Sequence, residues 1–431
     1  MRRVLLIAYY VPPAGGPAVQ RILQFIEHLP DAGWAVDVLT VNAGAYPNRD
    51  PSLLEAIPEG VTVHRTPAFD PLALYARLTS DGDGVPAGSL GEDDGSWLER
   101  IARWIRANVF IPDARVGWWP FAVYRGRQLL DRGRFDAIVT SGAPQSVHLI
   151  GRSLRRTTGR PWIADLHDPW TDISYYDEFP HTAWAKRLDA HFERSVLREA
   201  STVTTVSPSW ADLFHGKAPN RYAVVENGFD ADRFEHVEVM SRDAFVVAHV
   251  GKLYASRNPT AVWEALASLR EQGAVPECRV ELTGTVDPVA RRSIQQQGLD
   301  SVVTVDDFVP HHEAIRRMAR STLLLLVIEP FAHAEGMITS KLYEYLASGR
   351  PVLGVGPPDG DAAALLREHD AGTMVAWGDA ERAAAVLRAH YEAWDAGTPR
   401  PGAAWDAIQV HNRRHQAQRL ADVLDAAVDT R

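Results

Sequence analysis

Short apolar runs alternate along the chain with longer stretches in which apolar residues recur every three or four positions. The runs are rich in Val, Ile and Leu, which is typical of strands buried on both faces of a parallel sheet. The longer stretches indicate amphipathic helices that cover such a sheet. Strands that alternate with helices in this way indicate an α/β fold. The pattern predicts strands at residues 4–8, 35–41, 137–140, 162–165, 202–206, 223–225, 245–250, 279–282, 302–305, 323–327 and 351–355.

The alternation is interrupted near residue 235, where a polar and irregular stretch separates two series of strands. With 431 residues, the chain is also too long for one ordinary hydrophobic core. The end of the chain has the pattern of one long helix. We therefore expect two doubly wound domains and a terminal helix, at residues 1–235, 236–404 and 405–431.

Composition narrows the class of protein further. Apolar residues make up 46% of the chain and charged residues 23%, as in globular proteins and unlike fibrous or disordered ones. The net charge of −10 argues against bulk nucleic-acid binding, which needs a basic surface. The only cysteine, Cys278, cannot form a disulfide within the chain, and its place at the start of an apolar strand indicates a packing role.

The sequence shows no sign of a membrane span or a secretion signal. No stretch approaches the roughly 18 uninterrupted apolar residues that a spanning helix needs. The apolar run after Arg2 and Arg3 is too short for a signal peptide, and Pro12 and Pro13 follow it in place of a cleavage site. We therefore expect a cytoplasmic protein. This expectation includes an enzyme that works at the inner face of the membrane.

Two segments of the first domain depart from the regular pattern. Residues 79–96 are rich in Gly, Ser and Asp and are predicted to be a flexible insertion. Residues 98–130 mix tryptophans with arginines, which is compatible with a surface for an anionic or lipid-like acceptor, or with peripheral membrane contact. The alternative is a helix pair whose tryptophans pack inward, and the usual packing role of large aromatic residues favours it.

Gly15 and Gly16 stand between the first strand and the first helix. Glycines there permit a positive φ and the close approach of a ligand, and the amides of a helix start can receive an anion. An ordinary tight turn is the alternative. A dinucleotide fingerprint does not fit, because a third glycine is missing and Asn42, not an acid, follows the second strand.

The second domain opens with a comparable turn, in which Gly251 ends a strand and two cations, Lys252 and Arg257, precede a helix near Pro259. Both cations are placed to face a diphosphate beside the start of that helix. Two solvated surface cations are the alternative. Thr283 and Gly284 end another strand at the same edge, where ligands gather in open α/β sheets.

A second helix start follows in the run Glu335-Gly-Met-Ile-Thr-Ser-Lys-Leu-Tyr-Glu344. Thr339 and Ser340 are predicted to cap a helix over residues 341–348, whose free amides suit a phosphate. Lys341 and Glu344 lie three residues apart and therefore share one face, where the carboxylate can accept two hydrogen bonds from a ribose diol. A surface salt bridge is the alternative.

His167 lies just past the end of the strand at 162–165, where ligands of such folds gather. Pro169 restrains Asp168 and fixes the turn. A neutral imidazole there can donate to a sugar hydroxyl, with Asp165 and Asp168 orienting the ring. The alternative is a histidine that only bonds the backbone of the turn.

Together these motifs resemble glycosyltransferase family 4, a retaining family with the GT-B fold. The resemblance covers nearly the whole chain and is most specific in the run from Ser340 to Val352. It implies two Rossmann-like domains that face each other across a cleft, with the acceptor bound to the first, the nucleotide-sugar donor to the second, and the terminal helix packed back on the first domain.

The resemblance also implies individual roles. Glu344 matches the second glutamate of the family's Glu-x7-Glu motif, which holds the donor ribose. Lys252 and Arg257 match a basic pair that holds the diphosphate, and His167 matches a histidine that faces the donor sugar. Val309 stands where backbone atoms of the family meet the nucleotide base.

One departure concerns the first glutamate of that motif, which contacts the donor sugar. Gly336 occupies its position, and the nearest acid is Glu335. Either Glu335 fills the role through a shifted loop, or this chain recognises its sugar differently.

The expected reaction is transfer of a sugar from a nucleoside-diphosphate sugar to a hydroxyl acceptor, with retention and through an oxocarbenium-like transition state. No cofactor or metal is expected, because cations and helix amides stabilise the leaving diphosphate. Three alternatives stay open: a sugar-nucleotide epimerase, a phosphorylase with a pyridoxal cofactor, and a non-catalytic nucleotide-sugar binding protein. Two kinds of acceptor also stay open, a small molecule and a lipid-linked saccharide.

Overall fold

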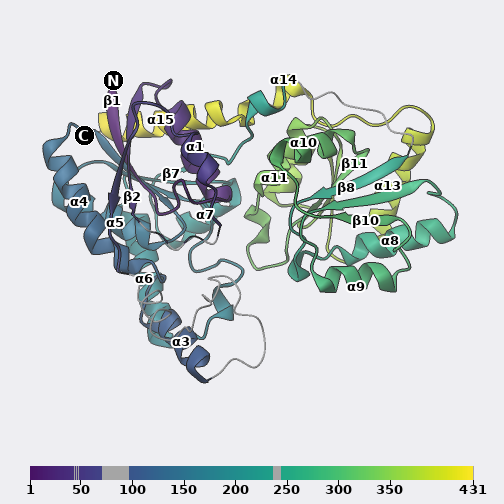
Figure 1. The fold of residues 1–431 in the computed structure, drawn as a ribbon, viewed down its shortest axis with the longest axis horizontal. Helices are drawn as coiled ribbons and strands as arrows, with labels where there is room; N and C mark the ends of the chain where they lie inside the picture. The colour runs from purple at the N-terminus through teal and green to yellow at the C-terminus, as the bar shows by residue number, and fades with distance from the viewer. Residues whose placement is uncertain (43, 45, 47, 70–96, 236–243, 431) are drawn as a thin grey trace. The chain divides into compact units, whose positions relative to one another are not determined.

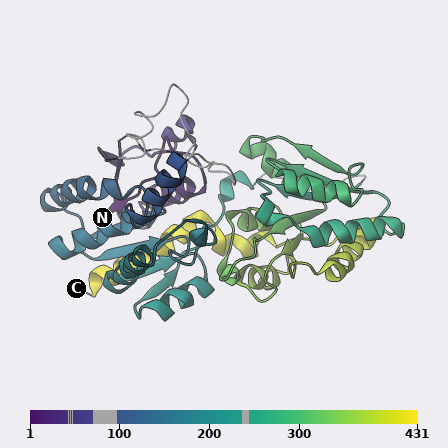
Figure 2. The same cartoon turned by 90° about the horizontal axis from the view of Figure 1, so that it is seen from below.

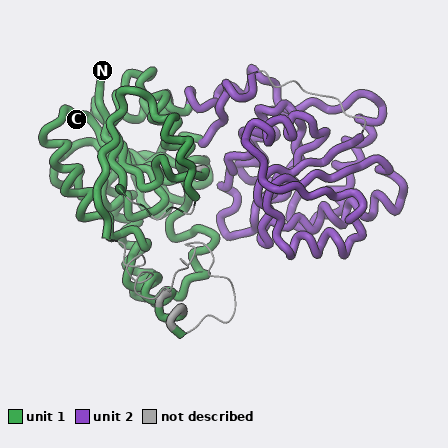
Figure 3. Tube along the Cα trace, viewed as in Figure 1, with its two compact units in different colours: residues 1–226, 416–431 green, residues 227–415 purple. Residues whose placement is uncertain are grey.

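The computed structural model describes residues 1–42, 44, 46, 48–69, 97–235 and 244–430, and they form two compact units. Unit 1 comprises residues 1–226 and 416–431, and unit 2 comprises residues 227–415 (Figure 3). The division therefore falls earlier than residue 235, and residues 405–415 belong to unit 2. The predicted flexible insertion at 79–96 lies outside the described residues.

Unit 1 is built on a parallel sheet in the order β3-β2-β1-β4-β5-β6-β7 (Figure 1). Its strands are β1 (Arg2–Ile7), β2 (Trp34–Val41), β3 (Thr62–Thr66), β4 (Ala137–Gly142), β5 (Trp162–Leu166), β6 (Thr202–Thr205) and β7 (Tyr222–Val224). Its helices are α1 (Pro17–His28), α3 (Trp97–Asn108), α4 (Trp119–Arg132), α5 (Ser146–Thr158), α6 (Ala183–Glu199), α7 (Pro208–Lys217) and α15 (Arg413–Asp429).

Unit 2 repeats this architecture with the strand order β10-β9-β8-β11-β12-β13, again all parallel. Its strands are β8 (Phe245–Val250), β9 (Cys278–Thr283), β10 (Val303–Asp306), β11 (Leu323–Val327), β12 (Val352–Val355) and β13 (Gly372–Val375). Its helices are α8 (Thr260–Glu271), α9 (Pro288–Gln296), α10 (His311–Arg320), α11 (Ser340–Ala347), α12 (Asp361–Glu368), α13 (Ala380–Asp395) and α14 (Trp405–Ile408).

Each sheet reverses its strand order once, between β1 and β4 in unit 1 and between β8 and β11 in unit 2. Loops diverge at such a reversal, so the carboxyl ends of these strands leave room for a ligand. The glycine turns of the sequence follow β1 and β8 and therefore lie at the two reversals.

The α/β fold and the central strands agree with the sequence pattern, but two strands were missed. β3 and β13 lie at the edges of their sheets and carry polar or half-exposed residues, so they lack an apolar run. The prediction of one long terminal helix was wrong. The helix is divided into α14, a 3₁₀ turn at Gln409–His411 and α15, because Asn412 has an extended backbone.

The described part of α15 after Gln416 packs on unit 1 (Figure 2). Its apolar face, including Leu420 and Leu424, joins the core formed by β1 and α1. Asp425 accepts hydrogen bonds from Arg2 at 2.6 Å and from the indole of Trp34 at 3.1 Å. The last helix thus completes the core of the unit that the first strand begins.

In the part of the chain that the structure describes, every helix is too short or too polar to cross a membrane.

Candidate active site

In unit 2, Gly251, Gly284 and Lys341 meet at the sheet reversal. Both glycines have a left-handed φ, +118° and +114°. A methyl group on Gly284 would lie 2.7 Å from the carbonyl oxygen of Gly251, and one on Gly251 would lie 2.5 Å from Nζ of Lys341. The glycines therefore let the chain turn and let the lysine lie directly against the backbone.

Lys341 is half-buried on the first turn of α11. Its partial burial and, after it, the charge of Arg257 lower the pKa of its ammonium to about 8, while Glu344 acts in the opposite direction. In the described part of the chain the ammonium has no hydrogen-bond or ion-pair partner. A partly buried cation without a partner is costly, so this position suits an anionic ligand.

Arg257 lies in the 3₁₀ turn Ala255–Arg257 that follows β8. Its Nε is 3.3 Å from Oε2 of Glu329, which follows β11 on the other side of the reversal. Arg257 and Lys252 both approach the ring of Tyr254, with Cζ at 5.7 Å and Nζ at 6.0 Å from its centroid. Lys252 is exposed, and the structure adds half-buried Lys341 to the predicted basic pair.

The start of α11 provides further polar groups. Thr339 occupies the cap position that the sequence predicts, but its side chain makes no capping hydrogen bond. Its hydroxyl is buried and has no partner among the described residues. Such an unsatisfied hydroxyl is unusual and suits a ligand oxygen. Ser340 is the first residue of α11 and is half-buried.

Glu344 lies one turn inside α11 and is half-buried. His311 donates from Nε2 to its Oε1 at 2.9 Å, and Nδ1 of His311 accepts from Arg233. A salt bridge between Lys341 and Glu344, which was the alternative interpretation, is absent from the described residues. Sequence reasoning missed His311 and Arg233, because no spacing rule links either residue to Glu344.

The remaining predicted site residues of unit 2 differ in exposure and in their hydrogen-bond partners. The hydroxyl of Thr283 already accepts from Arg317 at 2.9 Å. Val309 is half-buried and packs on the core, beside an almost fully exposed Phe308. Glu335 is exposed and lies 3.5 Å from His333, whereas Gly336 is buried.

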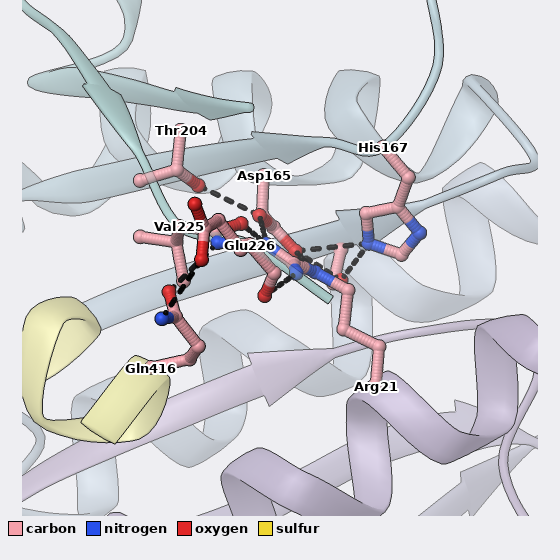
Figure 4. Close-up of polar contacts among 8 residues, drawn as sticks. Arg21, Asp165, His167, Thr204, Val225, Glu226 and Gln416 are labelled. Atoms are coloured by element: carbon pink, nitrogen blue, oxygen red, sulfur yellow. Dashed lines mark hydrogen bonds and ion pairs between the residues drawn. The ribbon is translucent and has the colours of Figure 1, made fainter. Parts of the chain in front are cut away.

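In unit 1, a buried polar network surrounds Asp165 at the end of β5 (Figure 4). Arg21 of α1 donates to both carboxylate oxygens, at 3.0 and 2.7 Å. Ser141 of β4 and Thr204 of β6 donate to the same carboxylate at 2.6 and 2.7 Å. Burial alone would raise the pKa of Asp165, but Arg21 and His167 hold it well below its usual range.

His167 joins this network through one ring nitrogen. Nε2 lies 2.9 Å from Oδ2 of Asp165 and 2.7 Å from Oγ of Ser141. Because Ser141 already donates to Asp165, Nε2 carries the proton and donates. Nδ1 points away from the carboxylate (Figure 4) and is an acceptor in the neutral ring. The ring nitrogen Nε2 thus contacts two side chains of the network, and in this tautomer Nδ1 offers an acceptor in place of the expected donor.

Arg21 also links α1 to the residues that follow β7. Its guanidinium donates to the carbonyls of Val225 and Glu226, at 2.8 Å each. Gln416 of α15 accepts from the amide of Glu226 at 2.9 Å and donates to its carboxylate. Sequence reasoning missed this role of Arg21.

The glycine loop of unit 1 is less open than the sequence suggests. The amide of Gly15 donates to the carbonyl of Asn48 at 3.1 Å, so it is not available to an anion. Gly16 has a φ of +110° and precedes α1 without a side-chain cap. Of the two glycines, Gly16 alone keeps the arrangement predicted for ligand approach.

The tryptophan- and arginine-rich segment at 98–130 is divided between both interpretations. Trp118 is buried and donates to Thr66 at 2.7 Å, and Trp119 donates to Ser153 at 3.0 Å. These two pack inward, as the favoured alternative predicts. Trp97 and Trp104 on α3 are exposed, which that alternative does not predict.

Comparisons with known proteins agree with this architecture. Residues 15–228 match a family model described as a glycosyl transferase 4-like domain. A protein of Salmonella typhimurium assigned as the colanic acid biosynthesis glycosyltransferase WcaL is 26% identical over 195 residues. That match covers 42% of this chain and 48% of WcaL, so it spans about half of the curated relative.

Solved structures with the same fold cover nearly the whole chain. Sucrose-phosphate synthase from Thermosynechococcus elongatus has a TM-score of 0.60 at 16% identity. The match covers 100% of this chain and 97% of the synthase chain. The lipopolysaccharide outer core galactosyltransferase WaaB has a TM-score of 0.60 at 13% identity. The match covers 98% of this chain and 99% of the WaaB chain. The pneumococcal O-GlcNAc transferase GtfA, solved with UDP and GlcNAc, has a TM-score of 0.58 at 8% identity, covering 99% of each chain.

Proposed function

The chain belongs to the family 4-like glycosyltransferases with the GT-B fold, and we propose that it moves a sugar from a nucleoside-diphosphate sugar to a hydroxyl group, with retention and without a metal ion. Unit 2 binds the donor in this proposal, and unit 1 binds the acceptor. The leaving group is the nucleoside diphosphate.

One observation carries the proposal: Lys341 is a half-buried cation without a partner in the described residues, and the charge of Arg257 acts on it. Two cations close together at a sheet reversal repel each other until an anion binds between them. A diphosphate supplies that anion. The buried hydroxyl of Thr339 and the first amides of α11 add hydrogen-bond donors for its oxygens.

The same groups support the chemical step. As the bond from the sugar to the diphosphate breaks, negative charge develops on the leaving oxygen, and Lys341, Arg257 and the α11 amides stabilise it. These cations take the place of a divalent metal. Glu344, held by His311, accepts hydrogen bonds from the ribose of the donor.

His167 acts on the sugar in this proposal. Its Nε2 proton is held by Asp165, so neutral Nδ1 accepts a hydrogen bond from a sugar hydroxyl. A neutral ring also avoids placing a positive charge beside the developing oxocarbenium ion. Arg21, Ser141 and Thr204 are positioning residues, since they act through Asp165.

The named function of WcaL suggests a saccharide acceptor in bacterial polysaccharide synthesis. We propose a lipid-linked acceptor, with the enzyme working in the cytoplasm at the inner face of the membrane. The structure of GtfA contains UDP, so uridine donors are the first to test.

The test is turnover after exhaustive chelation. The purified protein is mixed with a panel of nucleoside-diphosphate sugars and saccharide acceptors, and products are identified by mass spectrometry. A new glycoside with retained anomeric configuration is expected. An epimerised donor would favour an epimerase, nucleotide binding without any product would favour a binding protein, and activity that returns only with magnesium or manganese would contradict the metal-free mechanism.

A further inference from the structure

A chain of polar contacts leads away from Glu344 on α11. His311, on the neighbouring helix α10, donates from Nε2 to Oε1 of Glu344 at 2.9 Å (Figure 1). Nδ1 of His311 accepts from the guanidinium of Arg233 at 2.9 Å. Nε of Arg233 also donates to Oδ2 of Asp230 at 2.7 Å. We call Asp230, Arg233 and His311 the relay, and all three lie in unit 2, as Glu344 does.

The far end of the relay is held by the core of unit 2. Asp230 and Arg233 belong to the 3₁₀ turn Ala231–Arg233 and its cap. Phe229 and Phe234 flank this turn on either side, and both are buried in the core that also packs on α10 and α11. Their rings lie 6.1 Å apart in an edge-to-face contact. The turn therefore has a fixed place, from which Arg233 reaches the exposed side of α10.

Hydrogen bonding fixes the state of His311. A guanidinium only donates, so Nδ1 must be the acceptor, and Nε2 carries the proton that Glu344 receives. The side chain of His311 is 41% exposed, so packing alone does not hold its ring. The hydrogen bonds at its two ring nitrogens hold it instead. Arg233 is thus the residue that keeps His311 turned toward Glu344.

This orientation decides how many acceptors Glu344 offers. His311 uses one lone pair of Oε1, and Oε2 has no hydrogen-bond or ion-pair partner among the described residues. A carboxylate held in one orientation can accept from both hydroxyls of a ribose diol at once, whereas one that rotates meets them one at a time.

We propose that Arg233 is a positioning residue that acts through His311 and makes Glu344 selective for nucleotides with an intact ribose diol. The inference rests on the proposed function, in which Glu344 accepts hydrogen bonds from the donor ribose. It adds a residue from the turn after β7, which contributes no strand or helix to the site, and it adds a measurable preference for ribose over deoxyribose.

The experiment is titration calorimetry of the full chain with UDP and GDP and with the 2′-deoxy form of each. The measured quantity is the Kd of the deoxy form divided by that of the ribose form. For the wild type we expect a ratio of roughly ten or more, because the deoxy form lacks a hydrogen bond to a charged group. Arg233→Met should lower the ratio by about three- to tenfold, chiefly by weakening the ribose form. Arg316→Met is the matched control, since Arg316 of α10 is 61% exposed and lies outside the relay.

A second variant tests whether Arg233 acts through His311. His311→Gln places an amide N–H near the position of Nε2 and needs no partner at Nδ1, so it should keep most of the ratio. Adding Arg233→Met to His311→Gln should then change the ratio by less than about twofold, because both substitutions act on the same contact.

Three results would overturn the inference. The first is an unchanged ratio in Arg233→Met. The second is an equal loss of affinity for the ribose and deoxy forms, which would assign Arg233 to the architecture of unit 2. The third is the full effect of Arg233→Met in the His311→Gln background. A wild type that binds neither UDP nor GDP would contradict the proposed function and the inference together, whereas ribonucleotide binding with any of these three results contradicts the inference alone.

Discussion

Each unit has a cation near the reversal of its sheet, and the two cations differ in burial and in their partners. In unit 1, buried Arg21 forms a bidentate ion pair with Asp165 and also donates to two carbonyls. In unit 2, half-buried Lys341 has no ion pair among the described residues, and the charge of a second cation, Arg257, acts on it. The charge of Arg21 is thus matched within unit 1, whereas that of Lys341 has no such match among the described residues.

The difference separates architecture from binding. A buried ion pair with its hydrogen bonds satisfied fixes the elements that carry it, here α1, β5 and the end of β7. A buried charge without a partner destabilises the free protein and strengthens the binding of an opposite charge. Mutating the two cations should therefore have opposite effects on stability.

The largest expected effect is that of Arg21→Met. It leaves the carboxylate of Asp165 buried without its cation, which should lower the free energy of unfolding by about 3–5 kcal/mol. Chemical denaturation measures this loss. Arg127→Met is the control, since Arg127 is exposed and lies 3.7 Å from Asp131. A small change in both variants would show that the ion pair is not a structural centre of unit 1.

The opposite effect is expected for Lys341→Met. Removing the partly buried charge should raise the melting temperature by roughly 2–4 °C for each kcal/mol recovered. It should also weaken UDP binding by about 100-fold, the usual worth of a charged hydrogen bond. Differential scanning calorimetry and titration calorimetry test the two parts. Arg279→Met, an exposed site on β9, is the control, and a Lys341 variant that binds UDP normally would end the comparison.

His167→Ala should separate turnover from donor binding. Loss of the Nδ1 acceptor should lower kcat by roughly 10- to 100-fold, while the Kd for UDP stays near that of the wild type. The exposed His215 of α7 provides the control variant His215→Ala. If kcat is unchanged, or if the melting temperature collapses, His167 belongs to the architecture of unit 1 in the same sense as Arg21.

The smallest expected effect is on the pH dependence of UDP binding. In the proposed function the diphosphate binds best when Lys341 is protonated, and the pKa of this lysine is about 8. Affinity should therefore fall as the pH rises through 8, to roughly a tenth of its neutral value near pH 9. Lys341→Met should lack this dependence, and an identical pH profile in the variant would assign the titration to another group.

The stability of the free protein should change with pH in the opposite direction to the affinity for UDP. Between about 8 and the ordinary lysine value of 10.5, the unfolded chain binds more protons at Lys341 than the folded protein does. This lysine therefore becomes less destabilising as the pH rises through that window. Denaturation midpoints of wild type and Lys341→Met should converge there.

The sequence was sufficient where local rules apply. The glycine turns, the cap at Thr339 and the shared face of Lys341 and Glu344 follow from spacing along one helix or turn. The bidentate pair between Arg21 and Asp165 joins residues 144 positions apart, and no local pattern encodes it. The hydrogen bond between His311 and Glu344 was missed for the same reason.

The hydrophobic pattern also failed to predict the edge strands and the exposure of individual side chains. The half-exposed strands β3 and β13 do not carry the apolar signal of a buried strand. The periodicity of α3 correctly indicates an amphipathic helix, but an apolar stripe does not tell whether it faces the core or the solvent. Trp97 and Trp118 therefore look alike in sequence and differ in burial.

The return of α15 to unit 1 has a consequence for biosynthesis. The core between β1 and α1 is covered by Leu420 and Leu424, and Arg2 bonds Asp425 across 423 positions of the chain. A ribosome delivers β1 first and α15 last, so the nascent first unit has an uncovered apolar face while all of unit 2 is being translated. Unit 2 is continuous in sequence, so its segments are all translated before α15 is complete. The unit that begins the chain is thus the later of the two to be completed.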